Sequence, residues 1–186
     1  LLVWYYWLSA IWILAALLML LLSLIDWRTF IIPDEAVIGI GLAGLLVAAL
    51  KTYYRELIGW QSSFLGSYSL LIDWPGGIFG EHILAGIIGF IFFGAIFLLT
   101  KGRGMGFGDV KLAGAIGLLL GSPDAFLSFG LAFVIGAIIS LFLLATGKKK
   151  FKEAIPFGPY LVISVFVVMF CGYRIVDSYF KLFGLL

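Results

Sequence analysis

Long apolar runs alternate with short polar links along the whole chain. Such runs are too long and too apolar for the amphipathic helices of a water-soluble domain. About 20 mostly apolar residues are enough for a helix to cross the hydrocarbon core of a bilayer, where a helix satisfies its own backbone hydrogen bonds. We therefore expect an all-α, polytopic membrane protein with about six transmembrane helices in one bundle, formed as a single domain by residues 1–186.

The predicted helices follow the apolar runs. They cover approximately residues 1–25, 34–50, 82–99, 110–120, 125–145 and 155–172. The fourth is short, and residues 51–80 look like a loop whose Trp and Tyr side chains suit the membrane interface. We expect the last residues, to Leu186, to lie along the surface. Because the first residue is Leu1 rather than Met, we expect the chain to be a piece of a longer protein.

The composition supports a lipid environment and excludes several kinds of site. The chain is 63% hydrophobic and 12% charged, whereas soluble domains carry about 25% charged residues. Its net charge of +2 gives no reason to expect nucleic-acid binding. Cys171 is the one cysteine and His82 the one histidine, so no disulfide, thiolate site or metal cluster is expected.

Basic residues are divided unequally between the two sets of loops that six spans create. Eight of the twelve Lys and Arg fall in one set, and four fall in the other. The richer set comprises Arg28, Lys101, Arg103, Lys111, Lys148, Lys149, Lys150 and Lys152, and the poorer set comprises Lys51, Arg55, Arg174 and Lys181. Since cytoplasmic loops carry the excess of positive residues, Asp26 and Asp109 are predicted to lie near helix ends on the cytoplasmic side.

Two of the ten acidic residues, Asp26 and Asp109, directly adjoin apolar segments. An ionisable group at such a position is costly and is by default a functional candidate. Each also has a structural interpretation, because Asp109 could cap a helix and Asp26 could extend to the interface beside Arg28. If the two carboxyl groups meet in a partly dry site, one keeps a proton while the other can activate water for attack on an amide. Such a pair titrates as a unit, so neither is assigned the acid role.

Glycines surround Asp109 in the segment GMGFGDVKLAG, residues 104–114. Gly104, Gly106 and Gly108 are expected to take backbone conformations closed to other residues and to let an extended substrate come close. A phosphate-binding loop is a weaker interpretation, since no strand precedes the segment and no Gly-Lys-Ser/Thr follows it.

Three segments together resemble the bacterial type IV prepilin peptidases, a family of membrane aspartic proteases with a Gly-x-Gly-Asp signature. The matching positions are Asp26, Pro33 and Asp34 in DWRTFIIPDE, Gly106, Gly108, Asp109 and Lys111 in GMGFGDVKLAG, and Pro156, Gly158 and Pro159 in PFGPYL. They extend from residue 26 to residue 161, which is most of the chain.

The resemblance implies that Asp26 and Asp109 form a catalytic dyad facing the cytoplasm from the bacterial inner membrane. The implied substrates are prepilins and the pseudopilins of type II secretion, which are cut after a glycine at the end of a short basic leader. Membrane lipid is the other expected partner, and neither nucleic acid nor a cofactor for proteolysis is expected. No oligomeric state is predicted. S-adenosylmethionine and zinc would enter only with an N-terminal methyltransferase domain, which this chain lacks.

The other matched residues are given lesser roles. The glycine segment is expected to contact the unwound substrate, and the proline-rich segment from Pro156 to Pro159 to shape the site, although it could equally be an ordinary helix start. The role of Lys111 is left open. Many members of the family have an acidic residue where this chain has Arg103.

Three other functions fit parts of the sequence pattern. The presenilin and signal-peptide-peptidase group shares Gly-x-Gly-Asp but pairs it with Tyr-Asp and Pro-Ala-Leu, whereas here Ile25 precedes Asp26 and no Pro-Ala-Leu occurs. A proton-coupled transporter would place acidic groups near the middle of its spans and show inverted repeats. A structural membrane subunit without catalysis is excluded only by an assay.

Overall fold

The computed structural model describes residues 2–58, 63–71, 77–147 and 155–184. Within these ranges the chain forms α-helices and one short 3₁₀-helix and contains no strand. The elements are α1 (Leu2–Thr29), α2 (Asp34–Ile58), η1 (Gly66–Leu71), α3 (Gly77–Leu99), α4 (Phe107–Leu120), α5 (Asp124–Ala145) and α6 (Gly158–Leu182). The expected all-α fold is confirmed.

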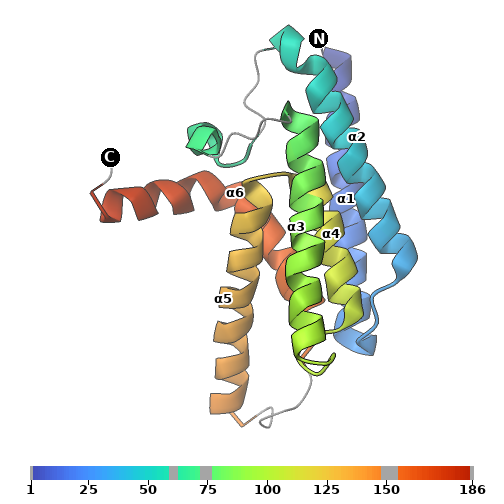
Figure 1. The fold of residues 1–186 in the computed structure, drawn as a ribbon, viewed down its shortest axis with the longest axis vertical. Coiled ribbons are helices and arrows are strands. Elements are labelled where there is room, and N and C mark those ends of the chain that lie inside the picture. Colours follow the sequence, from blue (N-terminus) through green and yellow to red (C-terminus); the bar gives the residue numbers. More distant parts are fainter. Residues whose placement is uncertain (1, 59–62, 72–76, 148–154, 185–186) are drawn as a thin grey trace.

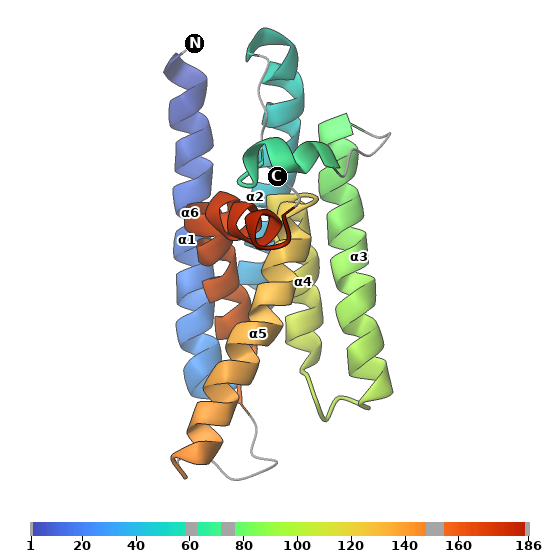
Figure 2. The ribbon, with the colours of Figure 1, turned by 90° about the vertical axis from the view of Figure 1, so that its left-hand side faces the viewer.

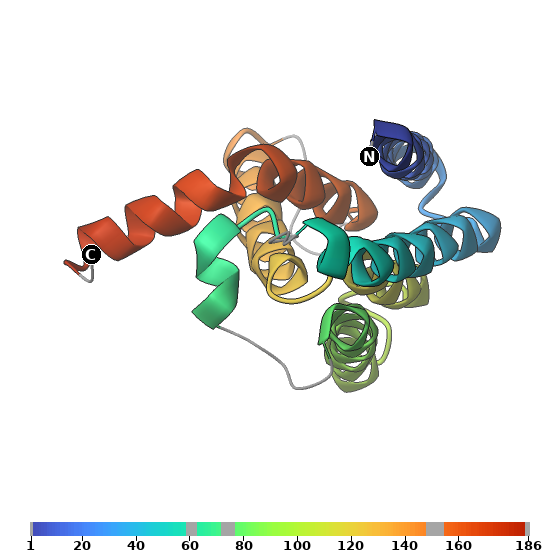
Figure 3. The ribbon, with the colours of Figure 1, turned by 90° about the horizontal axis from the view of Figure 1, so that it is seen from above.

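Helices α1 to α5 run approximately along one common axis, up and down the bundle (Figures 1 and 2). One end of the bundle collects the end of α1, the start of α2, the α3–α4 connection, the end of α5 and the start of α6 (Figure 1). Figure 3, which looks down this axis, shows that α6 begins within the bundle and that its last part extends away from it. Asp26 and Asp109 are therefore brought to the same end, as the sequence predicted.

Five helices are long and apolar enough to cross a membrane, which makes the chain a multi-pass membrane protein. These candidate spans are Tyr6–Thr29, Asp34–Tyr54, Gly77–Leu99, Asp124–Ala145 and Gly158–Leu182. The remaining helix, α4, has 14 residues. At 1.5 Å per residue it is about 21 Å long, shorter than the hydrocarbon core of a bilayer.

Helix α4 is enclosed by its neighbours. It packs against α2 and α3 and also contacts α5 and α6. Glycines allow the close approach: a Cβ atom on Gly44 of α2 would lie 2.5 Å from the carbonyl carbon of Leu118, and one on Gly117 would overlap the carbonyl of Ala85 on α3. Small residues at such contacts let helix backbones meet in lipid.

Several predicted boundaries differ from the structure, and the two largest differences are at the ends of α2 and α6. Helix α2 continues to Ile58, although residues 51–58 were expected to be loop. Lys51 does not end this helix because its side chain is buried and its ammonium lies 5.9 Å from the centre of the Trp12 ring. Helix α6 continues to Leu182, and the expected surface segment is its last part, which extends sideways away from the bundle in Figure 1.

Candidate active site

Asp26 lies in the last turns of α1, and its side chain is buried. Its Oδ2 atom accepts a hydrogen bond of 3.1 Å from the backbone N–H of Gly158, the first residue of α6. A Cβ atom on Gly158 would lie 2.6 Å from the same oxygen. Only glycine therefore fits here without displacing the carboxylate. The proline-rich segment therefore begins a helix, which is one of its two interpretations from the sequence. The N–H of Gly158 in this segment also fixes the Asp26 carboxylate.

The link from α1 to α2 turns sharply at Phe30, which has a φ of 56°. Pro33 immediately precedes α2, and its carbonyl accepts a 3.3 Å hydrogen bond from the N–H of Val37. Asp34 begins the helix and forms an ion pair with Lys111 of α4. This ion pair joins α2 to α4 beside the site and gives Lys111 a structural partner.

Asp109 is the third residue of α4 and is buried. The helix begins at Phe107 rather than at Val110, so Asp109 is not the capping residue itself; the cap is Gly106. The Oδ2 atom of Asp109 accepts a 3.1 Å hydrogen bond from the N–H of Gly106. Its Oδ1 atom is also buried and has no hydrogen-bond partner among the described residues. One oxygen thus stabilises the helix start while the other remains available.

Asp109 lies outside the five candidate spans. Burial, and secondly the charge of Asp26, raise the pKa of Asp109 to about 7, while the hydrogen bond from Gly106 acts in the opposite direction. A carboxyl group with such a pKa is protonated in a large fraction of molecules near neutral pH. A carboxyl group that can hold a proton near neutral pH, with a second carboxyl group lining the same cavity, is an arrangement suited to acid–base chemistry.

The glycines before Asp109 serve a different purpose from the one expected. Among Gly102, Gly104, Gly106 and Gly108, only Gly102 has a positive φ, of 71°. Close packing explains two of the others: a Cβ atom on Gly108 would lie 2.8 Å from Ile32, and one on Gly104 would lie 3.0 Å from the side chain of Thr100. The expectation of unusual backbone freedom at Gly104, Gly106 and Gly108 was wrong, and Gly104 and Gly108 are instead positions where small size is needed.

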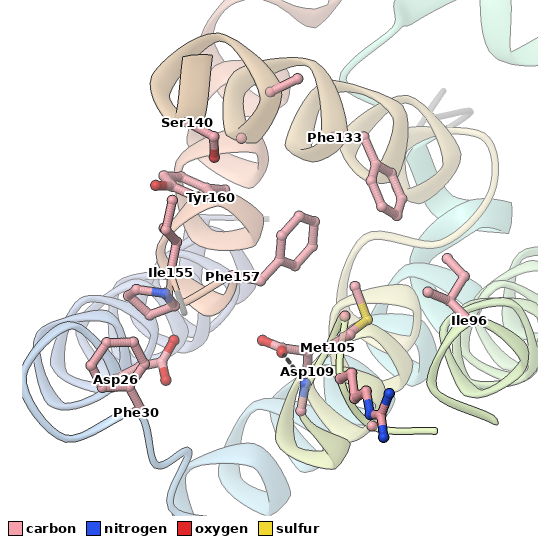
Figure 4. A pocket seen from close by; sticks show the side chains of 17 residues that line it. Asp26, Phe30, Ile96, Met105, Asp109, Phe133, Ser140, Ile155, Phe157 and Tyr160 are labelled. Carbon is pink, nitrogen blue, oxygen red and sulfur yellow. Dashed lines mark hydrogen bonds between the residues drawn. The ribbon is translucent and has the colours of Figure 1, made fainter. Parts of the chain in front are cut away.

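Asp26 and Asp109 line one cavity of about 640 Å³. Figure 4 shows their carboxyl groups entering this space from opposite sides, one from α1 and the other from the start of α4. Of the other sequence candidates, the cavity lining includes Gly104, Gly106 and Pro156. It does not include Pro33, Gly108, Lys111, Gly158 and Pro159.

Aromatic side chains form a wall of the cavity. Phe133 of α5 and Phe157, just before α6, have ring centres 5.2 Å apart, and Phe93 of α3 stacks on Phe133 at 5.5 Å. Along α5 the lining continues with the small residues Gly136 and Ala137. Apolar walls lower the local dielectric constant, which strengthens the interaction between the two carboxyl groups.

Tyr160 also lines the cavity and was not singled out from the sequence (Figure 4). Its hydroxyl oxygen is buried without a hydrogen-bond partner. Within the described part of the chain, this atom and Oδ1 of Asp109 are the two buried side-chain polar atoms in that condition. Buried polar atoms are rarely left unpaired, so their presence on two lining residues indicates a site that water or a polar substrate completes. The one feature of the sequence that could have indicated a role for Tyr160 in the site is that it directly follows Pro159.

The ionisable side chains that line the cavity suit hydrolysis by carboxyl groups. The described residues contain no cluster of three or more His, Cys, Asp or Glu that could hold a metal ion. Two carboxyl groups with unequal protonation can activate a water molecule and polarise an amide carbonyl between them. The geometry is therefore compatible with cleavage of a peptide bond that enters the cavity.

Comparison with known proteins identifies a peptidase family. The family model described as "Type IV leader peptidase family" matches residues 13–141. Three curated relatives are each named prepilin leader peptidase/N-methyltransferase. They come from Xanthomonas campestris pv. campestris (28% identity; 88% of this chain and 50% of the relative), Pseudomonas putida (27%; 89% and 51%) and Legionella pneumophila (31%; 92% and 52%).

The chain spans about half the length of these curated relatives. No solved structure matches it. The family model nevertheless covers more than half of the chain and includes both aspartates of the cavity. The chain belongs to the type IV leader peptidase family.

Proposed function

We propose that this chain is an aspartic endopeptidase that removes the short basic leader of type IV prepilins and of type II secretion pseudopilins. Asp26 and Asp109 are its catalytic dyad, and proteolysis uses no cofactor. The proposal rests on one observation: two aspartates from distant parts of the sequence line a single cavity, and each has one oxygen held by a backbone N–H. Membership in the leader peptidase family supplies the substrate class.

The dyad acts by general acid–base catalysis. The ionised carboxyl group takes a proton from a water molecule as its oxygen attacks the scissile carbonyl carbon. The protonated carboxyl group hydrogen-bonds the carbonyl oxygen and then transfers its proton to the leaving amine. The hydrogen bonds from Gly106 and Gly158 fix one oxygen on each aspartate, so the remaining oxygens are available for water and substrate.

The site faces the cytoplasm of the bacterial inner membrane in this proposal. At that end, the last turn of α1 carries Arg28 and the α3–α4 connection carries Lys101 and Arg103, and an excess of positive residues near the span ends is typical of the cytoplasmic side. A leader joined to a membrane helix presents its cleavage point at this depth. The segment must be unwound before cleavage, because a helix engages its own carbonyl groups.

The test is cleavage of a co-expressed prepilin in membranes, followed by loss of the leader on a gel. Asp26→Asn and Asp109→Asn should each lower the rate by at least about 100-fold, which is the range that acid–base groups contribute. Asp34→Asn is the matched control, because Asp34 lies near the site but pairs with Lys111 on a partly exposed surface. It should retain most of the activity, since exposed ion pairs contribute about 1 kcal/mol or less.

Normal cleavage by either dyad variant would refute the proposed mechanism. A transporter would leave the prepilin uncut in the wild type, although it could still depend on both aspartates for proton movement. A non-catalytic subunit would cut nothing and would be indifferent to both substitutions. Thermal unfolding in detergent shows that each variant is folded, so that loss of activity is not loss of protein.

A further inference from the structure

One basic residue lines the cavity that holds the two aspartates. Arg103, in the connection between α3 and α4, is the one Lys or Arg among the described residues that line it. The other charged lining residues are Asp26 and Asp109, and most of the rest are apolar, aromatic or glycine. A cation in such surroundings is a feature to be explained.

Among the described residues, Arg103 has no partner that would explain its position. It is exposed, and none of the ion pairs or side-chain hydrogen bonds among the described residues includes its guanidinium. Lys111, by comparison, is engaged with Asp34. The guanidinium is thus available to a group that enters from outside.

We propose that Arg103 selects substrates that carry an acidic side chain close to the scissile bond. This inference rests on the proposed peptidase function. The substrate must pass between Asp26 and Asp109, and Arg103 lines the same cavity, so the complementary carboxylate belongs within a few residues of the cut. Guanidinium and carboxylate pair in a planar, bidentate geometry that gives specificity as well as attraction.

The same charge sets the direction of the substrate. A cation disfavours a Lys or Arg side chain in the position next to it, because like charges repel in a partly apolar cavity. The basic part of a leader therefore avoids the Arg103 side, and the acidic side chain occupies it. Selectivity of this kind comes from the combination of one attractive and one repulsive contact.

The chain offers a matched control. Lys101 lies two residues earlier in the same connection and is also exposed, but it does not line the cavity. Lys101→Glu makes the same change in net charge as Arg103→Glu. An effect of overall loop charge would appear in both variants, whereas a contact in the cavity would appear only in the Arg103 variant.

The experiment uses the whole chain in membranes and a series of prepilins. In each prepilin, one Glu is placed at a single position between five residues before and five residues after the cut, with Gln at the other acidic positions. Relative kcat/KM values come from competition between each Glu substrate and its Gln counterpart. Wild type should prefer Glu at one position by about three- to tenfold.

Arg103→Glu should abolish that preference and favour Lys at the same position, while Arg103→Lys should retain part of it. Lys101→Glu should behave as wild type. The inference is overturned if wild type cleaves every substrate without positional preference, or if Lys101→Glu changes the preference as much as Arg103→Glu. Wild type that cleaves none of the prepilins would instead refute the proposed function.

Discussion

The backbone N–H of Gly158 at the start of α6 donates a hydrogen bond to Oδ2 of Asp26 near the end of α1. The two residues are 132 positions apart in the sequence. This contact makes the position of the Asp26 carboxylate depend on where α6 begins. It also leaves no space for a side chain at residue 158.

Gly158→Ala should therefore lower the cleavage rate by about 10- to 100-fold, because small displacements of a catalytic group have effects of this size. The added Cβ atom would lie 2.6 Å from Oδ2 of Asp26 and must displace it. The measurement is the initial rate of prepilin cleavage at saturating substrate. Gly130→Ala on α5 is the control, since nothing lies within 4 Å of a Cβ atom there. Equal rates for the two variants would contradict the role given to the Gly158 contact.

Packing of α2 on α4 predicts opposite outcomes for two glycines of α2 that lie one turn apart. A Cβ atom on Gly44 would lie 2.5 Å from the backbone of Leu118, whereas on Gly41 its nearest neighbour is the Leu118 side chain at 3.8 Å. Gly44→Ala should lower the free energy of unfolding by about 1–3 kcal/mol through overpacking. Gly41→Ala should leave it unchanged or raise it by up to about 1 kcal/mol, as for glycine within a helix. Thermal unfolding in detergent separates the two, and a similar loss in both would show that α2 and α4 are not in such close contact.

The cleavage rate should fall as the pH rises above about 7. The pKa of Asp109 is raised to about 7, so the pair keeps its shared proton below that pH and loses it above. Without that proton no acid remains for the leaving amine, and the rate should approach a tenfold loss per pH unit. The apparent pKa belongs to the two carboxyl groups together. The initial cleavage rate is measured from pH 6 to 9 for the wild type and, as a control, for Asp34→Asn. A wild-type rate that is constant over this range would refute this assignment.

The helices and the pairing of the two aspartates at one end could be predicted because both follow from apolar run length and loop charge. Helix ends were less predictable. Lys51 looks like the start of a loop, yet it is buried beside Trp12 within α2. The sequence pattern does not reveal a contact between a long side chain and another helix.

The details of the site depended on contacts between distant segments. Asp109 was considered as a possible cap, but the structure makes Gly106 the cap and leaves one Asp109 oxygen unpaired. Gly158 was recognised only as part of a proline-rich segment, because nothing local indicates that its N–H meets Asp26. The position of Arg103 in the lining of the cavity is likewise visible only in the structure.

The enclosure of α4 has a consequence for how this molecule can diversify. Asp109 belongs to α4, and a Cβ atom on Gly44 of α2 or on Gly86 of α3 would lie within 3 Å of Leu118 on that helix, so larger side chains there would disturb α4. The cavity face of α5, with Gly136 and Ala137, belongs to a different helix. In the proposed peptidase, substitutions on that face would change the cavity wall on a helix other than the one that carries Asp109.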